Sequence, residues 1–163
     1  MSKIYLATRY SKREKMKEYR DMLVHRGHEV TSRWIDYEDE NPEQFAFSEP
    51  VADTSSHAVP EVRAFVAQMD FEDILRAESF MCFTHWPSSR GGMWTEFGVA
   101  LTHRFWQKEM AKLPMRILVV GPRVNVFQNH PEVEVFNDAP DDPFLNFMNA
   151  MQSLSAGDAA HVG

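Results

Sequence analysis

Two hydrophobic periods alternate along the chain, one typical of β-strands and one typical of α-helices. Short apolar runs flanked by turn-prone residues predict buried strands. Between these runs, apolar residues recur at i, i+3, i+4 and i+7, which places them on one face of a helix. The expected strands cover residues 3–7, 28–35, 79–84, 115–121 and 132–136. The expected helices cover residues 11–27, 60–77 and 143–154, and a further helix carries Phe97, Leu101 and Phe105 on one face.

Turn and capping residues predict where these elements end. Ser11 is placed to cap the N-terminus of the first helix, and Gly27 stands where a helix C-cap favours glycine. Pro60 suits a first helical turn, and Gly121, followed by proline, ends the fourth strand. Residues 36–58 carry acids, prolines and serines without a clear period. We therefore expect a long loop there, and such loops often serve as lids or binding segments.

Alternating strands and helices predict a parallel sheet covered on both faces, which is a three-layer α/β sandwich. Five strands at this spacing suit the flavodoxin-like order 2-1-3-4-5. Ligands of such sheets bind beyond the carboxyl ends of the strands, here between the first and third strands. We expect one domain over residues 1–154 and a flexible tail over residues 155–163.

Composition narrows the classes of partner. Hydrophobic residues make up 44% of the 163 residues and charged residues 25%, which is the usual globular mix. No apolar run approaches the roughly 20 residues of a membrane-spanning helix, and the first residues lack the apolar stretch of a signal peptide, so we expect a cytoplasmic protein. A net charge of -7 argues against binding to nucleic acid or anionic membranes. A small molecule is the expected partner.

Neither a metal nor a cofactor is expected. The lone cysteine, Cys82, stands in an apolar run and is interpreted as a buried small hydrophobe, so there is no disulfide framework. Histidines and acids lack the spacing of zinc ligands. The sequence has neither a Walker A nor a G-x-G-x-x-G pattern, which argues against nucleoside triphosphate hydrolysis and dinucleotide redox chemistry.

Polar residues that suit an anion follow the first and third strands. The groups after the third strand combine hydroxyls, a guanidinium and uncrowded backbone N–H groups just before a helix. Similar groups follow the first strand. The candidate substrate-binding residues are Thr8, Arg9, Ser11, Ser88, Ser89, Arg90 and Gly92, together with Trp86, which could meet a base by stacking, as could His85. The alternative for all of them is ordinary loop polarity.

Glu96 is the carboxylate that most needs an explanation, because it lies in an otherwise apolar helical run. We expect it in the first turn or so of that helix, where the helix dipole favours a negative charge. An ionised carboxylate that faces a cleft can act as a nucleophile or a base. The alternative is an acid that only stabilises the helix.

Four stretches occur in a characteristic order: "KIYLA", "MDFEDILRAESFMCFT", "GGMWTEFGVAL" and "ILVVGPRVNVF". Together they resemble the nucleoside 2-deoxyribosyltransferase superfamily, which includes the 2'-deoxynucleoside 5'-monophosphate N-glycosidases. The resemblance spans most of residues 3–136 and implies a flavodoxin-like fold, a homodimer or higher homo-oligomer, and metal-free cleavage of an N-glycosidic bond. It also implies that Glu96 attacks the anomeric carbon, that Tyr5 orients Glu96, and that Asp70 assists at the sugar or the base.

Departures from the family pattern favour a nucleotide substrate. Transferases acting on free nucleosides carry a second acid six residues before the nucleophile, and Arg90 stands there in this chain. The serine and glycine loop of the monophosphate-cleaving branch is better matched, and a guanidinium beside a phosphate is favourable. Glu78 stands where the family usually has aspartate. Asn125 or Asn129 could enter a neighbouring subunit's site, and the sequence does not choose between them.

The leading hypothesis is cleavage or transfer at the N-glycosidic bond of a (deoxy)nucleoside 5'-monophosphate through a glycosyl-enzyme on Glu96. One alternative is a non-catalytic nucleotide-binding or sensing module, for which the missing second acid is the main support. A nucleoside deoxyribosyltransferase is a second alternative. A third is an interaction domain that binds a protein through the acid-rich residues 36–58.

Overall fold

The structure, a computed structural model, describes residues 1–44, 60–86 and 91–160. Its centre is a five-stranded parallel sheet in the order β2-β1-β3-β4-β5. The strands are β1 (Lys3–Ala7), β2 (Glu29–Val30), β3 (Ser79–Phe83), β4 (Arg116–Val120) and β5 (Val133–Phe136). The fold is therefore the flavodoxin-like α/β sandwich, and the strand order predicted from the sequence is confirmed.

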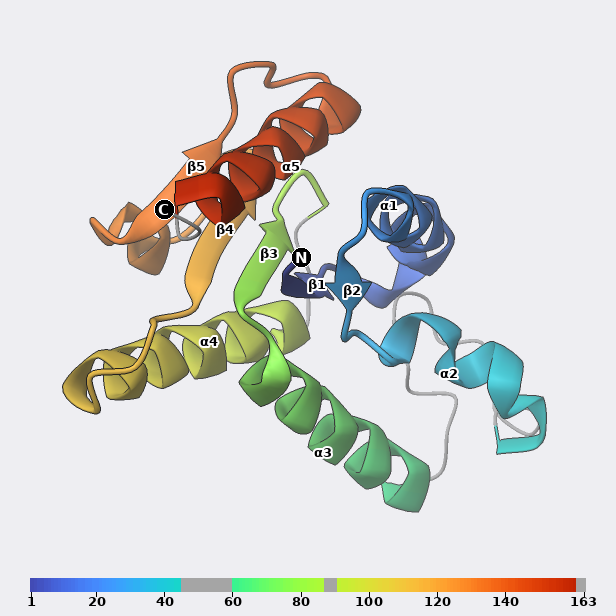
Figure 1. The fold of residues 1–163 in the computed structure, drawn as a ribbon. Coiled ribbons are helices and arrows are strands. Elements are labelled where there is room, and N and C mark those ends of the chain that lie inside the picture. The colour runs from blue at the N-terminus through green and yellow to red at the C-terminus, as the bar shows by residue number, and fades with distance from the viewer. Residues whose placement is uncertain (45–59, 87–90, 161–163) are drawn as a thin grey trace.

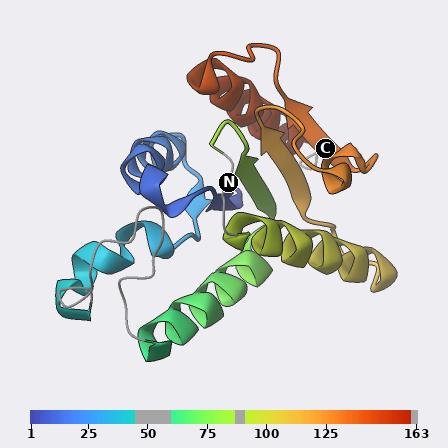
Figure 2. The ribbon, with the colours of Figure 1, turned by 180° about the vertical axis from the view of Figure 1, so that it is seen from behind.

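Helices cover both faces of the sheet (Figures 1 and 2). One face packs against α1 (Arg13–His25) and α5 (Pro143–Ala160), and the other against α3 (Pro60–Arg76) and α4 (Gly92–Glu109). The three central strands are almost entirely buried, as their continuous apolar runs require. The helix expected to end at residue 154 continues as α5 to Ala160.

The first helix begins later than its candidate cap. Ser11 lies in the short 3₁₀ helix η1 (Tyr10–Lys12), and α1 starts at Arg13 without a side-chain cap, so the predicted capping role of Ser11 is wrong. The C-terminal prediction is confirmed. Gly27 has φ +85°, and the N–H of His28 donates to the Leu23 carbonyl at 3.1 Å, which is a Schellman ending.

The second strand is much shorter than expected. Only Glu29–Val30 pairs with β1, and the chain turns at Thr31 into α2 (Trp34–Glu40) and the 3₁₀ helix η2 (Pro42–Gln44). Residues 34–40, expected as the end of a strand and the start of a loop, are thus helical. Trp34 and Ile35 are buried on the inner face of α2, so an apolar pair that suggested a strand is in fact a helix anchor. Residues 45–58 of the expected loop lie outside the described residues.

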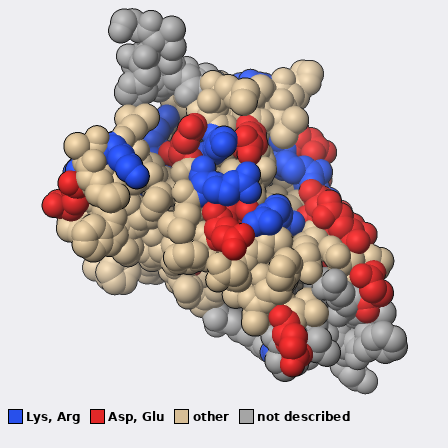
Figure 3. Space-filling model, turned by 60° about the horizontal axis from the view of Figure 1, so that its bottom comes forward, with Lys and Arg blue, Asp and Glu red and all other residues tan. Residues whose placement is uncertain are grey.

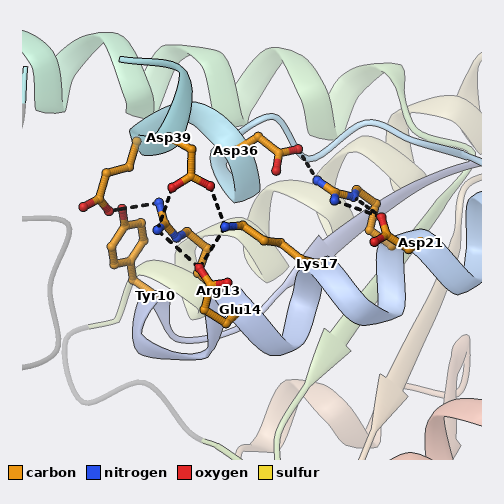
Figure 4. Close-up of polar contacts among 9 residues, drawn as sticks. Tyr10, Arg13, Glu14, Lys17, Asp21, Asp36 and Asp39 are labelled. Atoms are coloured by element: carbon orange, nitrogen blue, oxygen red, sulfur yellow. Dashed lines mark hydrogen bonds and ion pairs between the residues drawn. The ribbon is translucent and has the colours of Figure 1, made fainter. Parts of the chain in front are cut away.

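An ion-pair network joins α2 to α1 (Figure 4). Arg13 contacts Glu38 at 3.0 Å and Asp39 at 3.1 Å, while Lys17 donates to Asp39 at 2.5 Å. Arg20, one helical turn after Lys17 on α1, forms an ion pair with Asp36 of α2. These contacts hold α2 beside the start of α1, near the carboxyl edge of the sheet.

Charges are mixed on the face shown in Figure 3, where Lys and Arg side chains alternate with Asp and Glu instead of forming a patch of one sign. Within the described residues, no helix combines the length and apolarity needed to cross a bilayer.

Candidate functional site

Three candidate catalytic side chains come together from three elements. Asp70, on α3, and Glu96, on α4, line the same cavity of about 330 Å³ between these helices. Tyr5, at the centre of β1, is fully buried beside them, and the charges of both carboxyls raise the pKa of its hydroxyl. Apolar side chains, including Phe71 and Val99, form much of the cavity wall.

An aromatic stack fixes the ring of Tyr5. It lies parallel to the ring of Phe80 on the adjacent strand at 5.6 Å, and Phe80 meets Phe97 of α4 edge-on at 6.1 Å. The Tyr5 hydroxyl makes no well-formed hydrogen bond within the described residues. Burial, followed by the charges of Glu96 and Asp70, raises the pKa of Tyr5 well above its usual value. The hydroxyl is therefore neutral and available as a donor.

Asp70 is a carboxyl that can exchange a proton near neutral pH. Burial, together with the negative charge of Asp73, raises the pKa of Asp70 to about 7, while Tyr5 and Arg33 oppose the rise. Its Oδ1 atom is buried without a hydrogen-bond partner among the described residues. An acid with this pKa and an unoccupied oxygen suits general acid and base chemistry.

The position of Glu96 differs from the expectation. Helix α4 begins at Gly92, after Gly91 with φ +84°, so Glu96 is its fifth residue and lies in the second turn. The helix dipole acts mainly within the first turn, so it does not hold the charge of Glu96 as predicted. Burial, followed by the nearby Asp70, instead raises the pKa of Glu96 well above its usual value. Two like charges so close together repel, so the two carboxyls favour a shared proton.

Residues after β1 and β3 meet at the carboxyl edge of the sheet. The two strands are adjacent, with Ala7 opposite Cys82, and Lys12 Nζ lies over the ring of Trp86 at 5.5 Å. Thr8 is buried and its Oγ1 makes no hydrogen bond within the described residues. The sequence analysis did not include Lys12 among the candidate substrate-binding residues, although a cation in the segment after β1 suits an anion.

The other predicted substrate-binding residues have less defined surroundings. Ser11 is exposed in η1, Arg9 is half-buried, and Gly92 lines the cavity that holds Glu96. The three remaining candidates in the loop after β3, Ser88, Ser89 and Arg90, lie outside the described residues.

Several softer candidates have structural roles. His85 Nε2 lies 3.1 Å from Asn146 Nδ2 of α5, on the sheet face opposite Glu96, and burial lowers the pKa of His85. Asn125 caps the 3₁₀ helix η3 (Val126–Asn129) by accepting from the N–H groups of the second and third residues. Glu78 accepts from the Lys3 backbone N–H at 3.0 Å, at the opposite edge of the sheet from the site.

The sequence did not point to the pair formed by Arg33 and Asp73. Asp73 is completely buried one turn after Asp70, and its carboxylate accepts from Arg33 Nε at 2.8 Å. The interaction joins residues forty positions apart, so no local pattern shows it. Within the described ranges, no group of three or more His, Cys, Asp or Glu side chains is arranged to hold a metal ion.

A larger cavity of about 1030 Å³ lies between α4 and the η3 segment. Its wall includes Phe105 and Phe127, which are 55% and 65% exposed. It contains neither Asp70 nor Glu96, so the smaller cavity is the better candidate for chemistry.

Comparisons with known proteins give a structural similarity but no sequence match. No family model matches the chain, and no curated protein matches it. Among solved structures, the chain is similar to the CMP N-glycosidase BcmB of Clostridium botulinum, with 16% sequence identity and a TM-score of 0.47. That alignment covers 94% of this chain and 98% of the other.

Proposed function

We propose that this protein cleaves the N-glycosidic bond of a (deoxy)nucleoside 5'-monophosphate, by hydrolysis or by transfer of the glycosyl group. The observation that carries the proposal is the pair of carboxyls, Asp70 and Glu96, in one cavity beside the buried hydroxyl of Tyr5. Their neighbouring positions and raised pKa values suit one carboxyl that attacks and one that delivers a proton.

In the first step, an ionised Glu96 oxygen attacks C1' of the sugar. The bond between C1' and the base nitrogen breaks, its electron pair stays on the base, and protonated Asp70 donates its proton to the departing base. The products are a glycosyl ester on Glu96, the free base and ionised Asp70. Asp70 thereby takes the task of the second acid, whose place in the sequence is occupied by Arg90.

In the second step, water or an acceptor base attacks C1' of the ester. Asp70 accepts the proton of the attacking molecule, and the bond between C1' and the Glu96 oxygen breaks to restore the carboxylate. Tyr5 donates a hydrogen bond to the Glu96 oxygen that is not attacking, which orients the nucleophile. Its neutral hydroxyl and its fixed ring support that role.

The 5'-phosphate is assigned to the loops at the carboxyl ends of β1 and β3. Thr8, Arg9 and Ser11 would hold it from one side, and the loop after β3 from the other. Lys12 and Trp86, which already contact each other, would close the edge of the site. A guanidinium and hydroxyls favour a phosphate more than they favour an uncharged sugar.

The test is a panel of ribo- and deoxyribonucleoside monophosphates, with the free base measured by chromatography. Release of base by the wild type and a loss of about a thousandfold or more in Glu96→Gln are expected. Glu109→Gln, an exposed acid near the end of the same helix, is the matched control and should retain full activity. Binding without turnover would overturn the catalytic proposal and favour a sensing module.

We also propose that the protein is a homodimer formed through the α4 and η3 surface. Phe105 and Phe127 project from the same surface that contains the hollow of about 1030 Å³. A surface with both apolar projections and an apolar hollow can match a second copy of itself, as a two-fold interface requires.

A further inference from the structure

Asp73 is a buried carboxylate that has no task in the mechanism above. It lies one turn after Asp70 on α3, and its side chain is 0% exposed. Its Oδ2 accepts from the Arg33 backbone N–H at 3.0 Å, and its Oδ1 accepts from Arg33 Nε at 2.8 Å. Burial raises the pKa of Asp73, but acceptance on both oxygens from Arg33, together with Arg76 Nη1 at 3.7 Å, favours its ionised form.

The loop after β2 fixes this carboxylate in place. Thr31 Oγ1 donates to the Asp73 backbone carbonyl at 3.1 Å. The Arg33 guanidinium also donates to the Met69 carbonyl at 3.4 Å and to Glu72 at 3.3 Å. These contacts hold the turn of α3 that carries Asp70, so the distance between the carboxyls of Asp70 and Asp73 is set by the fold.

The negative charge of Asp73 acts unequally on the two cavity carboxyls. After burial, it is the charge that raises the pKa of Asp70, with Arg33 opposing, whereas the raised pKa of Glu96 results from burial and from Asp70. When two neighbouring carboxyls share a proton, a fixed negative charge beside one of them favours protonation of that one.

We propose that Asp73, held ionised by Arg33, is a positioning residue that biases the shared proton toward Asp70 and leaves Glu96 free to attack. This inference rests on the proposed function. The other ionisable groups around Asp70 do not supply a fixed negative charge. Tyr5 of β1 is neutral, Arg63 of α3 is a cation on the cavity wall, and Glu96 of α4 is the partner in the exchange.

The decisive variant is Asp73→Asn, which keeps the shape of the side chain and removes its charge. Base release requires a protonated Asp70, so its rate falls on the alkaline side as Asp70 loses that proton. Without the charge of Asp73, Asp70 holds its proton less tightly, and the alkaline limb of the profile moves to lower pH by about one unit. In an Asp70→Asn background, the same change should move nothing.

Glu72→Gln is the matched control, because Glu72 also pairs with Arg33 but is 52% exposed. Its profile should match that of the wild type. A purely structural role for Asp73 would lower stability and activity in Asp73→Asn at every pH and leave the limb in place, which would overturn the inference.

Carbon-13 NMR of labelled aspartate carboxyls in the wild type provides a test that needs neither a substrate nor a folded variant. Asp73 should lose its proton at lower pH than Asp70, and a titration of Asp73 at or above the pH at which Asp70 titrates would overturn the inference. If no nucleotide releases base, the proposed function fails, and the titration still decides the charge state of Asp73. If base is released but the limb and the Asp70 titration are unchanged in Asp73→Asn, the inference alone fails.

Discussion

Tyr5 and Tyr19 carry buried hydroxyls on opposite faces of the sheet, and neither makes a well-formed hydrogen bond within the described residues, although the Tyr5 hydroxyl interacts with the Asp70 carboxyl. Tyr5→Phe removes a weak contact with Asp70 and leaves the ring packing intact, so it should change the free energy of unfolding by no more than about 1 kcal/mol. If Tyr5 orients Glu96, the kcat of the Tyr5→Phe variant should fall by about tenfold or more. Thermal unfolding and base release, measured together, separate the two effects.

Tyr19→Phe is the control for that prediction. Its ring stacks on Phe147 at 4.1 Å, far from the carboxyl pair, and the substitution should leave both stability and kcat unchanged. Equal losses of activity in the two variants would mean that Tyr5 acts only through packing.

The raised pKa of Asp70 predicts that the stability of the protein depends on pH. Its pKa is raised to about 7 in the folded protein, whereas an unfolded aspartate has a pKa of about 3.9. The folded state therefore binds this proton more tightly, and the stability it contributes is complete below about pH 4 and is lost as the pH rises through 7. Asp70→Asn should raise the free energy of unfolding by about 4 kcal/mol at pH 8, relative to its effect at pH 4. Urea unfolding at the two pH values is the measurement, and an equal effect at both would contradict the raised pKa.

At the scale of single residues, the sequence predicted identities better than protonation states. Glu96, Tyr5 and Asp70 were chosen through the resemblance to a family, and the fold brings Asp70 and Glu96 to one cavity with Tyr5 buried beside them. The dipole argument for Glu96 does not hold, because Glu96 lies in the second turn of α4 and burial raises its pKa. The charge of Asp73 depends on Arg33, forty positions away, so it could be found only from the structure.

At the scale of elements, substitutions of two glycines, one at the end of a helix and one at the end of a strand, distinguish the cost of backbone strain from the cost of a steric clash. Gly27 ends α1 with φ +85°, and an added Cβ there meets no atom within 4 Å. Gly121 follows β4 with φ +119°, and an added Cβ would lie 2.6 Å from Nδ1 of His85, which Asn146 holds from the other side. Gly27→Ala should cost about 1 kcal/mol of stability, and Gly121→Ala at least twice as much. Chemical unfolding of both variants checks the order, and equal costs would show that His85 moves aside freely.

The elements that the sequence predicted best are those whose surroundings are uniform. Strands β1, β3 and β4 are buried on both faces, so an unbroken apolar run was enough to find them. The strand predicted over residues 28–35 was right at Glu29–Val30 and wrong after it, because a short apolar run does not distinguish a strand from one buried face of a helix. There the chain leaves the sheet after Val30, and Trp34 donates from Nε1 to the Leu6 carbonyl at 3.0 Å.

At the scale of the whole molecule, the parallel pairing of the strands followed from their alternation with helices, because parallel neighbours need crossover connections, and the number and spacing of the strands suited the observed order. The composition argued against nucleic acids and anionic membranes as partners. It contains no information on which surface of the folded chain remains exposed. The aromatic residues of α4 and η3 could be identified as exposed only from the structure, which shows that other residues form the core.

The proposed homodimer makes the uncovered surface testable. Phe127→Asp places a charge in the apolar hollow, and desolvating that charge in an interface costs several kcal/mol, so the variant should sediment as a monomer at micromolar concentrations while the wild type sediments as a dimer. Phe144→Asp, on an exposed residue of α5 outside the hollow, is the control and should remain dimeric. A monomeric wild type would refute the dimer without touching the carboxyl pair, because Asp70 and Glu96 lie in a different cavity of the same chain. Activity retained in the monomeric Phe127→Asp variant would show that the described residues need no neighbouring subunit for catalysis.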